Sequence, residues 1–235
     1  MSLLKLRSPL SLAVLPLAAI ALTLWRAPLF GAEAAVALAP PQIDNPKAPG
    51  PPQTAVLAGG CFWGMQGVFQ HVRGVRKVVA GYAGGDRSTA RYETVSSGAT
   101  GHAESVKITF DPAEVSFGQI LQIAFSVVLD PTQLNRQGND IGTQYRSVVF
   151  YADEGQKRIA EQYISQLDRS RAFARPIVTR VDPLKGFYAA EDYHQDFLIH
   201  HPDNSYIAFV DMPKVENFKR TFPELYNARP VTAHN

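Results

Sequence analysis

Short apolar runs alternate with amphipathic stretches from residue 54 onward, and this order constrains the fold more than any other feature of the chain. Residues 54–58 form an apolar run that ends at Gly59-Gly60. The apolar positions that follow are spaced by three and four, as in a helix: Phe62, Met65, Phe69 and Val72. This order predicts strand, tight turn and helix. Residues 75–82 predict a second strand, which completes a β-α-β unit with a right-handed crossover if its strands are parallel neighbours.

The alternation continues along the chain. Residues 104–110 alternate apolar and polar side chains, which predicts a strand. Ser116 and Gln119 form a capping-box pattern ahead of an apolar stripe that reaches Val128, which predicts a helix. A further strand, helix and strand are predicted at residues 144–151, 159–167 and 176–181. We therefore predict an α/β (α+β) fold, a ferredoxin-like two-layer sandwich with additional helices and loops.

The two ends of the chain differ from this pattern. Residues 8–25 carry no charge and follow Lys5 and Arg7, which is typical of an export signal. Two small-residue sites, at residues 32–34 and 37–39, suit a signal peptidase. We assign residues 1–34 to a signal peptide or N-terminal membrane anchor, 35–53 to a proline-rich linker, 54–212 to one catalytic domain and 213–235 to a C-terminal helical tail. The protein is expected to be exported to the periplasm, or to be membrane-anchored and face the periplasm.

The charge pattern limits the kinds of partner. The formal net charge is +2 and the basic residues are scattered along the chain. Nucleic-acid binding needs basic residues gathered in a patch or stripe, so this class of partner is excluded. We expect a monomer that acts on a small molecule or a polypeptide.

Cys61 is the only cysteine of the 235 residues. A single cysteine excludes an intramolecular disulfide and a cysteine-rich zinc site. Its predicted place at the start of a helix exposes the thiol to the positive end of the helix dipole, which favours the thiolate. The glycine turn before it and Trp63-Gly64 after it argue against burial. Cys61 is therefore predicted to be a nucleophile, and the alternative is a small buried apolar residue.

Other side chains are candidates for acid, hydrogen-bonding or metal chemistry. The alternation of its strand places Glu104 on the buried face, where a raised pKa would make it a general acid; the alternative is a carboxylate paired with Arg or Lys. Asp196 and His200 are spaced as a possible metal pair, but the run around His194 fits a solvated helix face better. Three residues of loops and strand ends offer hydrogen bonds, and by themselves are ordinary residues of such places: Tyr92, Asp140 and Tyr145.

Five stretches together resemble the peptide methionine sulfoxide reductase A family. They are GGCFWG at 59–64, GYAGG at 81–85, TGHAE at 100–104, DPTQLNRQGNDIGTQYRS at 130–147 and AEDYHQDF at 190–197. They span about residues 54–205, which is most of the proposed catalytic domain. Motifs of this length in this order are highly specific.

The resemblance implies a reaction and a role for each motif residue. Cys61 would attack the sulfoxide sulfur and become a sulfenic acid, while Glu104 protonates the oxygen. The polar side of the site would consist of Tyr92, Asp140 and Tyr145, and the apolar wall for the methyl group of Phe62 and Trp63. The family acts on the S epimer, free and in proteins, and the resemblance implies no metal, flavin or nicotinamide cofactor.

The sequence departs from many relatives in two places. No resolving cysteine follows Asp211, so the sulfenic acid must meet an external thiol: glutathione, a glutaredoxin or a thioredoxin-like protein. Leu129 stands where many relatives have histidine, and it connects to no chemistry. Two alternatives remain at this point, an exported cysteine hydrolase or acyltransferase that uses Cys61 with His194 as base, and a non-catalytic binding domain.

Overall fold

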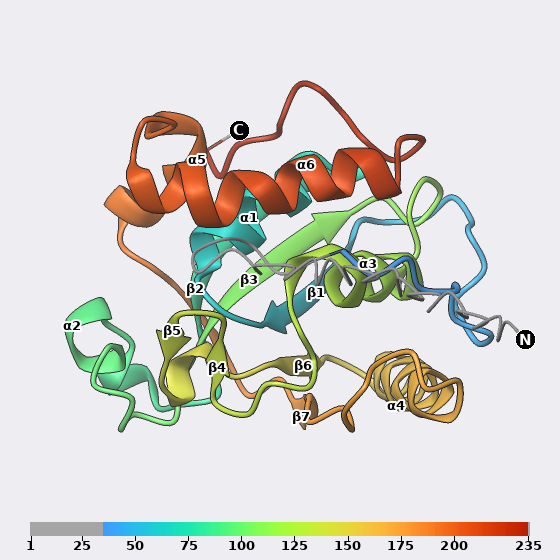
Figure 1. The fold of residues 1–235 in the computed structure, drawn as a ribbon, viewed down its shortest axis with the longest axis horizontal. Coiled ribbons are helices and arrows are strands. Elements are labelled where there is room, and N and C mark those ends of the chain that lie inside the picture. The colour runs from blue at the N-terminus through green and yellow to red at the C-terminus, as the bar shows by residue number, and fades with distance from the viewer. Residues whose placement is uncertain (1–34, 235) are drawn as a thin grey trace, which may run out of the picture.

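A six-stranded sheet with the order β7-β6-β1-β3-β2-β8 lies at the centre of the fold (Figure 1). The computed structural model describes residues 35–234. The strands of the sheet are β1 (Gln53–Ala58), β2 (Val75–Ala83), β3 (Ala103–Phe110), β6 (Val148–Tyr151), β7 (Arg180–Pro183) and β8 (Phe187–Ala189). A separate antiparallel pair consists of β4 (Arg136–Gln137) and β5 (Asp140–Ile141).

Helices and helical turns connect these strands. The longer helices are α1 (Phe62–Gln70), α3 (Phe117–Ile123), α4 (Glu154–Arg169) and α6 (Met212–Thr221), and the single turns are α2 (Tyr92–Val95) and α5 (Phe197–His200). Three 3-10 turns lie at Arg87–Thr89, Thr143–Tyr145 and Asp192–His194, and two π-helical turns at Ala124–Val128 and Ile207–Asp211. The predicted capping box is present at the start of α3.

The strand order confirms the predicted fold class and shows how the strands of the first β-α-β unit are placed. β3 lies between β1 and β2 and is antiparallel to both. The condition set for the first β-α-β unit, that its strands are parallel neighbours, is not met, because β1 and β2 are parallel but β3 lies between them. The four strands β6-β1-β3-β2 with α1 and α3 make the split β-α-β arrangement of a ferredoxin-like fold. β7 and β8 extend this sheet at its two edges.

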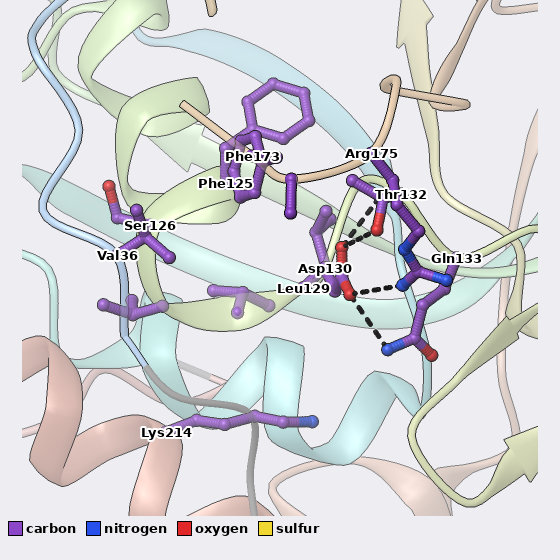
Figure 2. A pocket seen from close by; sticks show the side chains of 13 residues that line it. Val36, Phe125, Ser126, Leu129, Asp130, Thr132, Gln133, Phe173, Arg175 and Lys214 are labelled. Carbon is purple, nitrogen blue, oxygen red and sulfur yellow. Dashed lines mark hydrogen bonds and ion pairs between the residues drawn. The ribbon is translucent and has the colours of Figure 1, made fainter. Parts of the chain in front are cut away.

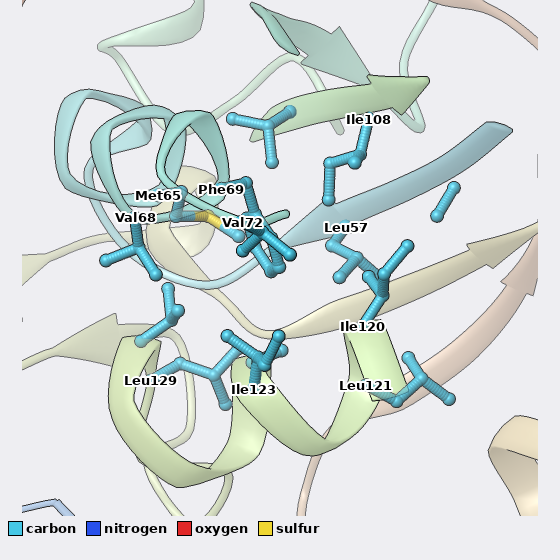
Figure 3. Close-up of a cluster of buried hydrophobic side chains, with 14 of the residues drawn as sticks. Leu57, Met65, Val68, Phe69, Val72, Ile108, Ile120, Leu121, Ile123 and Leu129 are labelled. Carbon is cyan, nitrogen blue, oxygen red and sulfur yellow. The ribbon is translucent and has the colours of Figure 1, made fainter. Parts of the chain in front are cut away.

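The core lies between the sheet and its covering helices. Leu57 of β1 and Ile108 of β3 meet apolar side chains of α1 and α3, such as Phe69 and Ile120 (Figure 3). The neighbouring Val56 points to the opposite face of the sheet, where a second and smaller apolar cluster forms. Both faces of the central strands are thus buried, which holds the ends of β1 and β3 in fixed positions.

The segment assigned as a proline-rich linker lies against the domain. Residues 35–52 form no helix or strand, which fits their proline content. The Tyr163 hydroxyl of α4 donates to the Ala39 carbonyl at 2.9 Å. The Asp44 carboxylate accepts from the Gly118 N–H at 2.8 Å and from the Ser116 hydroxyl at the start of α3. These contacts tie the segment to α3 and α4.

The C-terminal residues follow α1. In Figure 1 α6 lies along α1, and its Val215 and Phe218 are buried, as the amphipathic pattern of the tail predicts. Beyond α6 the chain returns to the end of α1, where the Asn227 N–H donates to the His71 carbonyl at 2.7 Å. The tail is therefore part of the packed domain.

Some predicted element boundaries are wrong. The strand predicted at residues 144–151 begins only at Val148, because residues 143–145 turn tightly to place Tyr145. The strand predicted at 176–181 is present only as β7, where it pairs with β6. The predicted signal peptide or anchor lies outside the described residues. Among the helices of residues 35–234, none is long and apolar enough to cross a membrane.

Candidate active site

The turn between β1 and α1 places Cys61 as the residue that caps the start of α1. Gly60 has a φ of 95°, which favours glycine, and its N–H donates to the Tyr145 carbonyl at 3.2 Å. A Cβ on Gly59 would lie 2.3 Å from a methyl carbon of Leu129. Leu129, the departure from many relatives, thus packs directly on the turn that carries the thiol.

The Cys61 side chain is buried, with 9% of its surface exposed. The expectation of an unburied thiol is therefore wrong, because Leu129 and Gln137 pack on the two glycines of the turn. Burial and the charges of Asp211 and Glu104 raise the pKa of the thiol, and the hydrogen bond from the Trp63 N–H does not offset them. Burial therefore favours the neutral thiol over the thiolate, the opposite of the effect expected from the helix start.

Glu104 lies on β3 opposite Tyr82, and 3% of it is exposed. Its carboxylate accepts a hydrogen bond of 3.1 Å from the Phe62 N–H, next to Cys61. Burial, with smaller contributions from the charges of Asp140 and Asp211, raises the pKa of Glu104 to about 8. Within the described residues it pairs with no arginine or lysine. A carboxyl group with this pKa can hold a proton at neutral pH and donate it.

The aromatic side chains at the start of α1 pack with the 192–197 segment. The Trp63 ring stacks on Phe197 at 3.8 Å, and its N–H donates to Nδ1 of His194 at 3.2 Å. Phe62 is buried, and its ring centroid lies 5.0 Å from that of His194, which also lies 4.5 Å from the Tyr92 ring. These rings form an apolar side of the site.

The polar side comes from the 140–145 segment and from Tyr206. Tyr145 is placed by its 3-10 turn, and burial and the charges of Glu104, Cys61 and Asp140 raise its pKa. The Asp140 carboxylate accepts a hydrogen bond of 2.5 Å from the Tyr206 hydroxyl. The structure thus brings together the sequence-predicted residues: Cys61, Glu104, Tyr92, Asp140, Tyr145, Phe62 and Trp63.

Three residues of this cluster were not predicted from the sequence: Tyr206, Asp211 and Lys214. Asp211 is fully buried, and its Oδ1 lies 3.2 Å from Nζ of Lys214, which is 8% exposed. The sequence of the tail contained a sign of their role. Asp211 and Lys214 fall on the buried helical stripe that continues with Val215 and Phe218. Charged residues on an apolar stripe are unusual. This pattern distinguishes the C-terminal helix from a helix that only packs on the domain.

The region around His194 differs from the solvated helix face that the sequence suggested. Asp196 has a φ of 55°, which interrupts the predicted helix, and its carboxylate is buried. That carboxylate accepts from the Gln70 amide and from the Ala233 N–H, whereas His200 is exposed. The pair is therefore not arranged as two metal ligands. Over residues 35–234 no group of three or more histidine, cysteine or acidic side chains is arranged to hold a metal.

A cavity of about 320 Å³ lies beside this cluster, between the π-helical turn at 124–128 and the loop at 130–133. Phe125 and Leu129 form apolar parts of its wall. Figure 2 shows the Asp130 carboxylate with its partners at one end and Lys214 along another side. Lys214 is thus shared between this cavity and the side chains around Cys61.

Comparisons with known proteins identify the family of the chain. The family model for peptide methionine sulfoxide reductase matches residues 53–226. Peptide methionine sulfoxide reductase MsrA 2 of Mesorhizobium japonicum is 57% identical over 80% of this chain and 96% of its own length. The protein of the same name from Synechocystis is 49% identical over 75% of this chain and 83% of its own.

Solved structures give the same result. Methionine sulfoxide reductase A of Corynebacterium diphtheriae is similar with a TM-score of 0.55 and 34% identity, over 64% of this chain and 76% of that one. Reduced Mxr1 of Saccharomyces cerevisiae has a TM-score of 0.59 at 28% identity, over 69% and 92%. The alternative of a cysteine hydrolase with His194 as base is not supported. The chain belongs to the peptide methionine sulfoxide reductase A family, whose members are oxidoreductases that act on sulfur groups.

Proposed function

We propose that the protein reduces methionine S-sulfoxide, free or within polypeptides, with Cys61 as nucleophile and Glu104 as proton donor. The observation that carries the proposal is the buried Glu104 carboxyl beside the Cys61 turn, with a pKa raised to about 8 by burial. The names of the relatives support the substrate class.

The chemistry follows from the polarity of the sulfoxide. Its sulfur is electrophilic, so the Cys61 sulfur attacks it while the oxygen takes a proton from Glu104. The phenol groups of Tyr92 and Tyr145 are donors for that oxygen, and the Trp63 ring is an apolar surface for the methyl group. The net step converts the Cys61 thiol and the sulfoxide into a sulfenic acid and methionine, so sulfur is oxidised in Cys61 and reduced in the substrate.

A test of the function supplies the purified protein with dithiothreitol and with the separated S and R epimers of methionine sulfoxide. Methionine should form from the S epimer alone, and also from an oxidised methionine peptide. Equal rates with both epimers would contradict the proposal.

The proton on Glu104 predicts a pH dependence. Burial raises its pKa to about 8, so the carboxyl is protonated below that pH and loses its proton as the pH rises through it. The rate of methionine formation should therefore decline above pH about 8, although deprotonation of Cys61 becomes easier there. The measurement is a single turnover of prereduced protein without added thiol, so that the ionisation of the reductant does not affect the rate. A rate that continues to rise to pH 10 would exclude Glu104 as the acid.

We further propose that an external thiol resets Cys61. One thiol displaces water from the sulfenic acid and forms a mixed disulfide, and a second thiol then releases Cys61. The presence of one cysteine in the whole chain supports this step. A thioredoxin-like protein should sustain turnover at micromolar concentration. The proposal of a protein donor fails if such proteins add nothing to turnover by small dithiols.

Export to the periplasm is likewise a proposal, supported by the charge pattern of residues 1–25. The contacts of residues 36–44 favour cleavage after Ala34 over cleavage after Ala39. The second site would remove Leu38, which is buried and whose carbonyl accepts from the Gln122 amide at 2.8 Å. N-terminal sequencing of periplasmic protein should start at residue 35, and full-length protein in the membrane fraction would favour an anchor.

A further inference from the structure

Asp211 and Lys214 form a buried ion pair that the proposed reaction does not use. Asp211 ends the π-helical turn before α6, and Lys214 lies in the first turn of α6. Removing two charges from water is costly, and replacement of a buried ion pair by apolar side chains is often neutral or stabilising. Stability alone is therefore a weak explanation for a pair at this position.

The pair lies against the first turn of α1, on the face that carries Cys61. Gly64 follows Cys61 by three residues, a spacing that puts both positions on one side of the helix. A Cβ on Gly64 would lie 2.1 Å from Oδ1 of Asp211 and 3.2 Å from Nζ of Lys214. The glycine leaves the space that the pair fills. Oδ2 of Asp211 is buried and has no hydrogen-bond partner among residues 35–234.

Other charged and titratable groups around Cys61 are acidic or neutral. When ionised, the carboxyl groups of Glu104 of β3, Asp140 of β5 and Asp211 raise the pKa of the thiol. The phenols of Tyr145 and Tyr206 remain protonated, because burial and these charges raise their pKa values. Burial lowers the pKa of His194, which keeps that ring neutral.

Lys214 is the basic side chain of this cluster in the described part of the chain. Burial acts to lower its pKa, but the charges of Asp211 and of a Cys61 thiolate outweigh it and raise the pKa. Lys214 is therefore positively charged when Cys61 loses its proton.

We propose that the Asp211–Lys214 pair sets the balance between thiol and thiolate at Cys61. The positive charge of Lys214 stabilises the thiolate, and the negative charge of Asp211 partly offsets this effect. Both are positioning residues, since they act through Cys61. This inference rests on the proposed function for its role in the reaction. The C-terminal helix carries no second cysteine, but through this pair it is part of the active site.

The same charge acts at two steps of the cycle. Lys214 stabilises the thiolate that attacks the sulfoxide. It also stabilises the Cys61 thiolate as the leaving group, when a second external thiol breaks the mixed disulfide and takes the partner sulfur with it. Thiols of lower pKa leave faster in this exchange.

The test is the rate of Cys61 alkylation by iodoacetamide as a function of pH, which involves no sulfoxide. Asp211→Asn leaves Lys214 uncompensated and should lower the midpoint of the profile by about one pH unit. Lys214→Met leaves Asp211 uncompensated and should raise it by about the same amount. The double variant should return close to the wild-type midpoint. Glu216→Gln and Lys219→Met, on the exposed side of α6, are matched controls that should not shift it.

The opposite signs of the two shifts distinguish this proposal from a purely structural role. A structural role would shift the alkylation midpoints of both single variants in the same direction, or shift neither. Shifts of the same sign, or none, in variants with wild-type circular dichroism overturn it. If Lys214→Met does not fold, Lys214→Arg replaces it and should keep the wild-type midpoint. Asp211→Asn should still lower the midpoint. An unchanged or raised midpoint in Asp211→Asn overturns the proposal. Opposite shifts in a protein that does not reduce methionine sulfoxide would leave this proposal standing and refute the proposed function.

Discussion

Replacement of Cys61 by serine should reduce methionine formation to the uncatalysed level, a loss on the order of 10⁴-fold or more. The serine hydroxyl has a much higher pKa than a thiol and cannot become a sulfenic acid, so both the attack and the oxidised intermediate are lost. Serine is close to cysteine in size, and the fold should persist because the turn depends on Gly59, Gly60 and the packing of Leu129.

The measurement is methionine released from methionine S-sulfoxide with dithiothreitol in excess. A sulfenic acid probe should label wild-type protein after one turnover and leave the Cys61→Ser variant unlabelled. Full activity in this variant would eliminate Cys61 as nucleophile and would revive the possibility that its thiol is only a packing group.

Glu104→Gln should slow the first turnover by about 10²–10⁴-fold, the usual cost of losing an acid catalyst. Glutamine has the size of the protonated carboxyl group and can still accept the 3.1 Å hydrogen bond from the Phe62 N–H. It cannot deliver a proton to the sulfoxide oxygen. Since the replaced group is buried and largely neutral at pH 7, the thermal stability should change little.

Two further measurements make this prediction specific. The decline of the rate above pH 8 should disappear in Glu104→Gln, because that variant has no group to lose the proton. Glu93→Gln, an exposed carboxylate on the neighbouring α2, serves as the control and should retain the wild-type rate. An equal loss in both variants would point to a general effect of negative charge.

Local patterns predicted most of the elements around the site. The order of β1, the Gly59-Gly60 turn and α1 follows from apolar spacing, and it placed Cys61 correctly at the start of a helix. The alternation along β3 placed Glu104 on a buried face, as the structure confirms. These features depend on residues close together in the sequence, so short-range periodicity is sufficient for them.

The errors arise where distant segments meet. Periodicity does not reveal strand neighbours, so the sequence left open whether β1 and β2 pair directly, and in the structure β3 lies between them. Asp211 and Lys214, about 150 residues further along the chain, pack against the first turn of α1, and burial raises the pKa of the Cys61 thiol. The helix predicted near residue 190 is interrupted at Asp196, because Gln70 of α1 and the tail bind that carboxylate.

The placement of α6 has a consequence for biosynthesis. Cys61 belongs to the first helix of the domain, whereas Asp211 and Lys214, which lie against that helix, come near the end of the chain. The nascent protein therefore lacks the cover that this part of the chain gives to the first turn of α1 until it is almost complete. Chains that stall or are clipped before α6 would present an unshielded cysteine, open to oxidants and to mixed disulfides with other proteins.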